Sequence, residues 1–209
     1  MERRDNYRIQ AGLAQQRFLG YDQQKLIEKL KLAHDEKYLY APMLGQLHRI
    51  CRATGALERQ SGETWVDANS FGEVLTFLDL LCDSREDRFL AGSWKNLLDF
   101  GRIFHRSLLE EGKDSWAERF SEDPEGFRRA CAALGGQPLP QGDVSYAIDL
   151  FDGLPFAIQL WLGDEEFPPR LRFLLDANAH MYLRYETMHY ARGLLLQRLE
   201  EALRREERL

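Results

Sequence analysis

The chain has 209 residues, of which 44% are hydrophobic and 30% are charged. These proportions are typical of globular proteins and unlike those of disordered ones. A chain of this length buries enough surface to form a core without disulfides or a structural metal. The formal net charge of −6 argues against a nucleic-acid-binding protein, because such proteins carry a basic excess.

The three cysteines, Cys51, Cys82 and Cys131, lie far apart and form no C-x-x-C pair. We therefore expect three free thiols and neither a zinc ribbon nor a disulfide framework. The first residues, Met1–Asn6, lack the apolar run of a signal peptide. No stretch approaches the roughly 18 apolar residues of a membrane span, so the expectation is a cytoplasmic protein without a membrane contact.

Helix and strand signals alternate in the first part of the chain. Asp22 is a typical N-cap for a helix with an apolar face, made of Leu26, Ile27 and Leu30. Residues 38–45 and 46–52 read as two short strands. Pro42 places the first of them at a sheet edge or a bulge, because proline cannot donate a hydrogen bond to a neighbouring strand.

Two further helices have recognisable starts. Ser70 and Glu73 have the spacing of a capping box, and the apolar residues of 74–81 follow at helical spacing. Asp123 followed by Pro124 is a strong helix start, since aspartate caps and proline suits the first turn. An additional helix is expected over residues 103–110.

The most regular pattern is C-terminal. Residues 144–150 and 156–162 both alternate between apolar and other side chains, as half-buried strands do, and Asp152-Gly153 between them predicts a tight hairpin turn. A third strand is expected over residues 171–175. A long helix from about Arg184 closes the chain, and an apolar stripe marks its buried face. The stripe consists of Met188, Ala191, Leu195, Leu199 and Ala202.

The elements together predict an α+β fold. It contains an antiparallel sheet with a C-terminal three-strand meander, packed by helices that include the long C-terminal helix. Short turns favour antiparallel pairing, because parallel strands need long crossovers. The N-terminal hairpin is expected to extend the same sheet. We expect a single α+β domain over residues 1–209, within which residues 1–60 can form an N-terminal helix-and-hairpin lobe.

One block of the chain is distinctive: Trp161-Leu162-Gly163-Asp164-Glu165-Glu166-Phe167-Pro168. Other short signals accompany it: Gly135-Gly136, Gly142-Asp143, Pro155, Leu174-Leu175-Asp176, Tyr182-Leu183 and Glu186. With this block the sequence resembles an uncharacterised prokaryotic family, domain of unknown function 3786. The resemblance implies a bacterial protein of no established activity, in a family associated with corrinoid or iron–sulfur metabolism of anaerobes.

The acidic part of this block is the first candidate binding site. Asp164, Glu165 and Glu166 lie between two predicted strands and are flanked by Trp161 and Phe167. Adjacent carboxylates attract a cation, and a turn alone would need only glycine, asparagine or proline. We predict that both aromatic rings pack against the final helix and leave the carboxylates outside. A simple solvated turn is the alternative interpretation.

A second group of polar residues begins at the end of the third strand: Asp176, His180, Tyr182, Glu186 and His189. Glu186 and His189 have the i, i+3 spacing of half a di-iron carboxylate site. The sequence has no second such pair, so we expect no metal site. The third strand should separate this group from the acidic turn by roughly 17 Å, at about 3.4 Å per residue. We therefore expect two separate regions.

The sequence contains no nucleophile elbow, no P-loop and no dinucleotide-binding glycine motif. The preferred interpretation is a non-catalytic binding or accessory module that uses the tryptophan–acidic turn for an unidentified small molecule or protein partner. The alternative is an enzyme, or a metal- or cofactor-handling protein, that uses the clustered aspartate, glutamate and histidine side chains. Neither interpretation identifies a cofactor.

Overall fold

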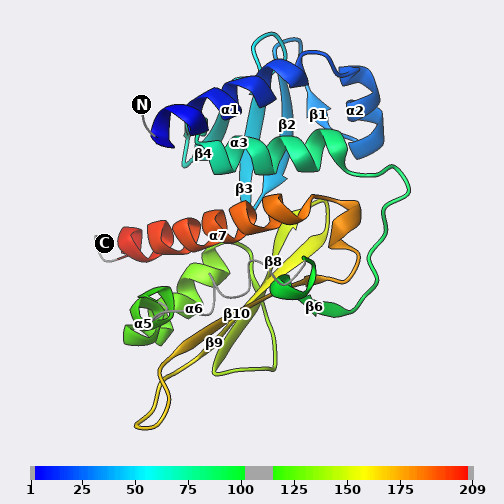
Figure 1. Ribbon diagram of the computed structural model, residues 1–209. Helices are drawn as coiled ribbons and strands as arrows, with labels where there is room; N and C mark the ends of the chain where they lie inside the picture. Colours follow the sequence, from blue (N-terminus) through cyan, green and yellow to red (C-terminus); the bar gives the residue numbers. More distant parts are fainter. Residues whose placement is uncertain (1–2, 102–114, 207–209) are drawn as a thin grey trace.

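The structure, a computed structural model, describes residues 3–101 and 115–206 (Figure 1). This part of the chain forms two five-stranded antiparallel sheets with helices packed against them, which confirms the α+β class. The helices are α1 (Arg3–Phe18), α2 (Gln23–Leu30), α3 (Phe71–Leu78), α5 (Ser115–Glu122), α6 (Pro124–Ala133) and α7 (Tyr185–Glu206). The shorter helical segments are the π-helix η1 (Asp79–Asp83) and the 3₁₀ turns η2 (Leu97–Asp99) and η4 (Ala179–Met181).

The first sheet is a meander in which each strand pairs with the next along the chain. Its strands are β1 (Ala33–His34), β2 (Tyr38–Met43), β3 (Gln46–Cys51), β4 (Leu57–Ser61) and β5 (Thr64–Asp67). Pro42 lies in the part of β2 that β1 does not reach, so its missing N–H costs no ladder bond, as predicted. The prediction that this hairpin extends the C-terminal sheet is wrong, because β2–β5 satisfy one another in a sheet of their own.

The second sheet has the order β6-β10-β9-β8-β7. Its strands are β6 (Trp94–Asn96), β7 (Gln137–Pro138), β8 (Val144–Phe151), β9 (Leu154–Trp161) and β10 (Arg170–Asp176). The predicted three-strand meander is its centre. Asp152 and Gly153 both have positive φ, 53° and 80°, which is the two-residue turn that matches the twist of a hairpin.

Helix starts follow the predicted caps in two of three cases. The Asp22 carboxylate accepts hydrogen bonds from the backbone N–H groups of Gln24 and Lys25, and Asp123 accepts one from Gly126. Ser70 precedes α3 but makes no side-chain capping bond. The capping-box prediction is therefore wrong in its chemistry, because the Glu73 side chain turns into the interior.

The helices connect the two sheets. Helix α1 packs on α3, α3 on α7, and α7 on α6, so α7 lies between the two halves of the molecule (Figure 1). The sheets also meet directly where the Leu44 backbone N–H donates to the Leu150 carbonyl, 3.1 Å away. A single hydrophobic cluster includes side chains from both sheets and from α7.

A buried ionic cluster joins the first sheet to α7. Glu73 of α3 is 4% exposed, and its Oε1 lies 3.1 Å from Nε2 of His48 on β3. The buried guanidinium of Arg198 on α7 donates to the same oxygen and, at 3.0 Å, to Glu201. Arg59 of β4 reaches Glu201 at 3.1 Å. This cluster, Glu73 with its four neighbours, ties β3, β4, α3 and α7 together.

Several helices and strands of the structure were not predicted from the sequence. They are helices α1 and α5 and strands β1, β4, β5, β6 and β7. The predicted helix over residues 103–110 lies outside the described residues. The three cysteines are free, as expected. The other predicted helices and strands are present, with ends shifted by at most three residues.

Candidate functional site

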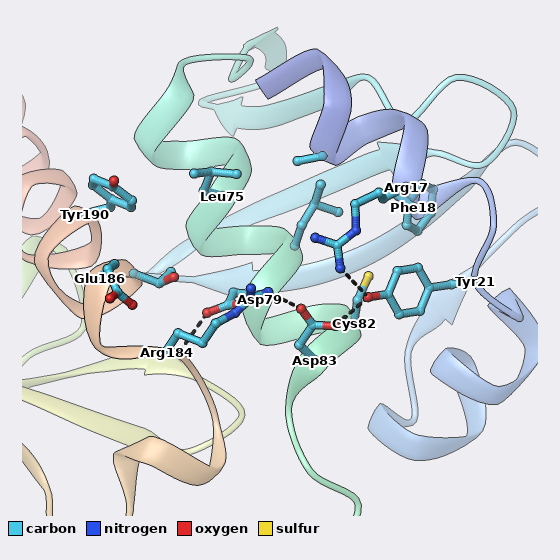
Figure 2. Close-up of a pocket in the computed structure, with 13 residues that line it drawn as sticks. Arg17, Phe18, Tyr21, Leu75, Asp79, Cys82, Asp83, Arg184, Glu186 and Tyr190 are labelled. Carbon is cyan, nitrogen blue, oxygen red and sulfur yellow. Dashed lines mark hydrogen bonds and ion pairs between the residues drawn. The ribbon is translucent and has the colours of Figure 1, made fainter. Parts of the chain in front are cut away.

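A cavity of about 280 Å³ lies where the end of α1, the end of α3 with η1, and the start of α7 meet (Figure 2). Its apolar lining consists of Ala14, Phe18, Leu75 and Leu78. Its polar lining consists of Arg17, Tyr21, Asp79, Cys82, Asp83, Arg184, Glu186, Thr187 and Tyr190. Small-molecule sites combine apolar side chains with placed polar groups, and this cavity contains both, with polar residues in the majority.

The π-helix η1 gives the cavity three of its polar groups. Helix α3 continues into η1 without a break, and η1 contributes Asp79, Cys82 and Asp83 to the lining. Single π-helical turns inside helices are rare and occur frequently at functional sites. The π-helical turn therefore supports a functional role for this wall of the cavity.

Arg184 fixes the start of α7 to this wall. Its Nε donates to Oδ1 of the buried Asp79 at 2.7 Å, and its backbone N–H donates to Oδ2 at 2.8 Å. Its guanidinium also pairs with Asp83. Because Asp79 receives both a side-chain and a backbone donor, its charge is compensated and it holds two helices at a fixed distance.

Tyr21 and Arg17 extend this hydrogen-bonded network towards α1. The Tyr21 hydroxyl donates to Oδ1 of Asp83 at 2.5 Å and accepts from Arg17 at 3.4 Å. Burial and the hydrogen bond to Asp83 raise the pKa of Tyr21 to about 12. The phenol is therefore neutral at neutral pH and serves as a hydrogen-bond donor.

The Cys82 thiol is part of the wall and is not an activated nucleophile. Burial and the negative charge of Asp83 raise the pKa of Cys82 to about 12. Only the thiolate attacks electrophiles or binds metals strongly, and this thiol is almost wholly protonated at neutral pH. Nucleophilic chemistry by this sulfur is disfavoured.

These environments predict different thiol reactivities in the folded protein. The hydrogen bond from Thr54 lowers the pKa of the half-buried Cys51, whereas burial raises that of Cys131. We expect Cys51 to react with a disulfide reagent at least about tenfold faster than Cys82 or Cys131. Stopped-flow absorbance with the wild type and Cys51→Ser should show one fast thiol and then none. A fast phase that survives Cys51→Ser would contradict this assignment.

Two exposed charges lie on opposite sides of the cavity. Figure 2 shows Arg17 of α1 beside Tyr21, and Glu186 of α7 on the other side, near Tyr190. The apolar part of the cavity lining, here called its floor, includes the buried Phe18 and the half-buried Leu75. A ligand lying across this floor would meet a cation at one end and an anion at the other.

Of the second predicted group, the structure places only Glu186 in this cavity. Asp176 is 2% exposed, and its carboxylate accepts backbone hydrogen bonds from Ala91, Gly92 and Asn178, each at 2.8 Å. Asp176 therefore holds the loop that contains Ala91 and Gly92 against the end of β10. This group as a whole does not converge on one point.

The other members of the second group have separate surroundings. Tyr182 is buried, with the Arg88 guanidinium 5.9 Å from its ring centroid. His180 is exposed on η4. The His189 ring packs edge-on against Tyr185, with their centroids 4.7 Å apart. Within residues 3–101 and 115–206, no group of three histidine, cysteine, aspartate or glutamate side chains has the geometry of a metal site.

The acidic turn is exposed, as predicted, but its aromatic flank is not packed as predicted. The Asp164 carboxylate accepts hydrogen bonds from the backbone N–H groups of Glu166 and Phe167, which closes the turn and lowers the pKa of Asp164. Phe167 is 67% exposed, so its predicted packing on α7 is wrong. Trp161 is half-buried, and the Arg172 guanidinium lies 5.7 Å from its ring.

Strand β10 separates the two predicted regions. The acidic turn precedes Arg170, and the second group begins at Asp176, at the other end of the strand. Seven extended residues span roughly 24 Å at about 3.4 Å each. The expectation of two separate regions agrees with this arrangement.

Most of the cavity residues were not singled out from the sequence. Asp79 lies inside the range 74–81 but is not one of its apolar residues, Asp83 follows that range, and Tyr21 lies between two helices. One signal was available: Asp79 and Asp83 are four residues apart, and they continue the helical register past Leu78. Like charges at this spacing destabilise a helix, so such a pair at a helix end favours a nearby cation, which here is Arg184.

Comparisons with other proteins give a family and no closer relative. None of the helices in the described residues combines the length and apolar character that crossing a membrane requires. No curated protein and no solved structure matches the chain. A family model described as domain of unknown function (DUF3786) matches residues 22–198, a range that includes both sheets and most of α7. The chain therefore belongs to the DUF3786 family.

Proposed function

We propose that this protein is a non-catalytic binding module that holds a small organic molecule in the cavity between α1, η1 and α7. The observation that carries the proposal is the cavity itself. It has an apolar floor and a rim on which two helices are already fixed by the Arg184–Asp79 and Arg184–Asp83 pairs. A site held in place before the ligand arrives loses less entropy on binding.

The state of the polar groups supports binding in preference to catalysis. Cys82 and Tyr21 are held in their neutral forms, and the carboxylates of Asp79 and Asp83 are engaged by Arg184. A general acid or base needs a pKa near the working pH. Tyr21 and Cys82, whose pKa values are raised to about 12, do not meet this requirement.

Size and charge define the class of ligand. A volume of about 280 Å³ is near the lower end of small-molecule sites, which corresponds to a single metabolite. Arg17 and Glu186 on opposite sides favour a ligand with an anionic group at one end and a cationic or donor group at the other. The apolar floor at Phe18 and Leu75 favours a hydrocarbon body between these ends.

The acidic turn remains a candidate contact of the same module. Asp164 is engaged by its own turn, whereas Glu165 and Glu166 are exposed next to Phe167 and Leu162, which is 40% exposed. Exposed acidic and apolar side chains of this kind serve better in contact with a partner protein than in enclosing a metabolite. The cavity is therefore the stronger site for the small molecule.

The test is to fill the cavity. Leu75→Trp places an indole on the floor, and we expect it to weaken binding of any cavity ligand at least about tenfold. Affinity-selection mass spectrometry with a mixture of metabolites identifies the compounds that the wild type retains. Leu162→Trp, at the exposed turn, is the matched control and should retain them all. A retained compound whose binding Leu75→Trp leaves unchanged would contradict the proposal.

A further inference from the structure

Three polar side chains of α7 line one wall of the cavity between α1, η1 and α7, the α1–η1–α7 cavity. They are Glu186, Thr187 and Tyr190. Glu186 and Tyr190 are four residues apart and so lie on one face of the helix, and Figure 2 shows both on the side of the cavity opposite Arg17. Burial raises the pKa of Tyr190, and the nearby charges of Tyr7 and Glu186 add to this effect. We call these three residues the α7 wall.

The polar atoms of the α7 wall have no hydrogen-bond or ion-pair partner within residues 3–101 and 115–206. This holds for the Glu186 carboxylate and for the hydroxyls of Thr187 and Tyr190. Thr187 is only 6% exposed, and buried hydroxyls in proteins normally have a partner. The α7 wall can therefore be completed by hydrogen-bond donors that enter the cavity.

Most polar groups elsewhere in the lining are already engaged. Arg184 pairs with Asp79 and Asp83, and Asp83 also accepts from Tyr21. Arg17 differs, because its one hydrogen bond in the described part of the chain is the 3.4 Å contact with the Tyr21 hydroxyl, and no carboxylate pairs with it there. The described lining thus offers a cation and, on the opposite side, the anion of the α7 wall to a ligand.

The α7 wall matches the chemistry of a primary ammonium group. An alkylammonium has three N–H donors and no acceptor, and the wall offers a carboxylate and two hydroxyls as acceptors. The negative charge of Glu186 favours a cation over a neutral amide donor. A quaternary ammonium has no N–H for the hydroxyls and is recognised by cages of aromatic faces instead. Alkylamines are protonated at neutral pH, since their pKa is about 10.4, as for lysine.

The positions of the two charges distinguish between classes of zwitterion. In an α-amino acid, the ammonium and the carboxylate are bonded to the same carbon, so both charges lie at one end of the molecule. Glu186 and Arg17 lie on opposite sides of the cavity (Figure 2), which requires charges at opposite ends. The floor at Phe18 and Leu75 suits the methylene groups between them.

We propose that the α1–η1–α7 cavity binds an ω-amino carboxylate, a hydrocarbon chain with a primary ammonium at one end and a carboxylate at the other. Glu186, Thr187 and Tyr190 accept the N–H groups of the ammonium. Arg17 donates to the carboxylate. This inference rests on the proposed function, because it names the ligand class of the same cavity.

Isothermal titration calorimetry with the series from 4-aminobutanoate to 8-aminooctanoate tests the proposal. We expect a best chain length, whose binding Glu186→Gln and Arg17→Gln each weaken at least about tenfold. Thr187→Val and Tyr190→Phe should each weaken it about threefold to tenfold, and Thr187→Ser, which restores the hydroxyl, should recover most of the loss. Glu165→Gln, the matched change at the exposed turn, should keep wild-type affinity.

Two altered probes test the chemistry of the ammonium end. We expect 2-aminohexanoate, an α-amino acid, and the N-trimethylated form of the best ligand to bind at least about tenfold more weakly than that ligand. Equal binding of either probe would overturn the proposal. Unchanged affinity in Glu186→Gln, or equal losses in Glu186→Gln and Glu165→Gln, would also overturn it.

The ligand class and the proposed function can fail separately. If no member of the series binds while the wild type retains other metabolites that Leu75→Trp loses, the ligand class is wrong and the cavity is still a small-molecule site. If a member of the series binds equally to Leu75→Trp, its site lies elsewhere and both proposals are wrong.

Discussion

Replacing Glu73 with glutamine is expected to lower the free energy of unfolding by about 3–5 kcal/mol. The glutamine removes the buried carboxylate that His48 and Arg198 both contact. Arg198, which is 4% exposed, then keeps only Glu201, whose side chain is 39% exposed. A buried charge that loses its partner costs more than the pair contributed, because its own desolvation is no longer compensated. The melting temperature should fall by roughly 10 °C, measured by calorimetry and by urea unfolding.

The pH dependence of this effect has a defined sign. Burial alone would raise the pKa of Glu73, but the hydrogen bond from His48 and the charge of Arg198 outweigh it and lower the pKa. A carboxyl group with a lowered folded-state pKa contributes stability that is fully present above its unfolded value of about 4.3. This contribution is lost as the pH falls through the folded value. The stability difference between wild type and Glu73→Gln should therefore shrink below about pH 4.

A matched surface pair provides the control for Glu73. Glu58 pairs with Arg49 at 2.7 Å, and the two side chains are 32% and 19% exposed. Glu58→Gln makes the same chemical change where water screens the charges, so it should cost less than about 1 kcal/mol. If Glu73→Gln costs no more than Glu58→Gln, the buried ionic cluster does not hold the first sheet to α7.

Asp176→Asn is expected to destabilise the protein by about 2–3 kcal/mol without affecting small-molecule binding. The buried carboxylate accepts three backbone N–H groups, and an asparagine must turn its NH₂ towards at least one of them. That buried donor is then unsatisfied, and the loop that contains Ala91 and Gly92 loses its attachment to β10. Urea unfolding measures the stability, and affinity-selection mass spectrometry measures the binding.

Asp164→Asn is the counterpart on the surface. Asp164 also accepts two backbone N–H groups, but at an exposed turn where water replaces a lost hydrogen bond. Its replacement should cost less than about 1 kcal/mol. Loss of ligand binding in Asp176→Asn with unchanged stability would show that Asp176 is a binding residue and not a support for the loop.

Local signals in the sequence predicted the fold well where the chemistry is local. The Asp22 and Asp123 caps, the positive-φ turn at Asp152-Gly153 and the three-strand meander depend on residues near each other in the chain. The resemblance to the family was also stated from short local motifs, and the family model over residues 22–198 confirms it. The single-domain interpretation of residues 1–209 stays a prediction.

Features that depend on distant partners could not be predicted in the same way. Glu73 has the spacing of a capping box, yet its partners come from β3 and from the middle of α7, 125 residues away along the chain. Phe167 was expected in the core because phenylalanine usually is, but the hydrogen bonds from the turn to Asp164 direct the chain outwards. The local propensity of a residue for a helix, a strand or the core contains no information on partners that lie far away along the chain.

The candidate cavity was missed for the same reason. Its walls come from three segments around residues 14–21, 75–83 and 184–190, and none of them contains a motif that names a chemistry. Only Glu186 was among the predicted site residues. The π-helical turn at η1, which brings Asp79 and Asp83 to Arg184, has no known signature in a single sequence and became visible only in three dimensions.

The central claim is that the α1–η1–α7 cavity holds a small molecule, and a crystal structure of the protein with a retained metabolite tests it most directly. We predict density for the compound on Phe18 and Leu75, with its anionic group towards Arg17 and its cationic or donor group towards Glu186. Crystals of Leu75→Trp grown with the same compound should show an empty site. Density for the compound elsewhere, with the cavity empty in the wild type, would contradict the account.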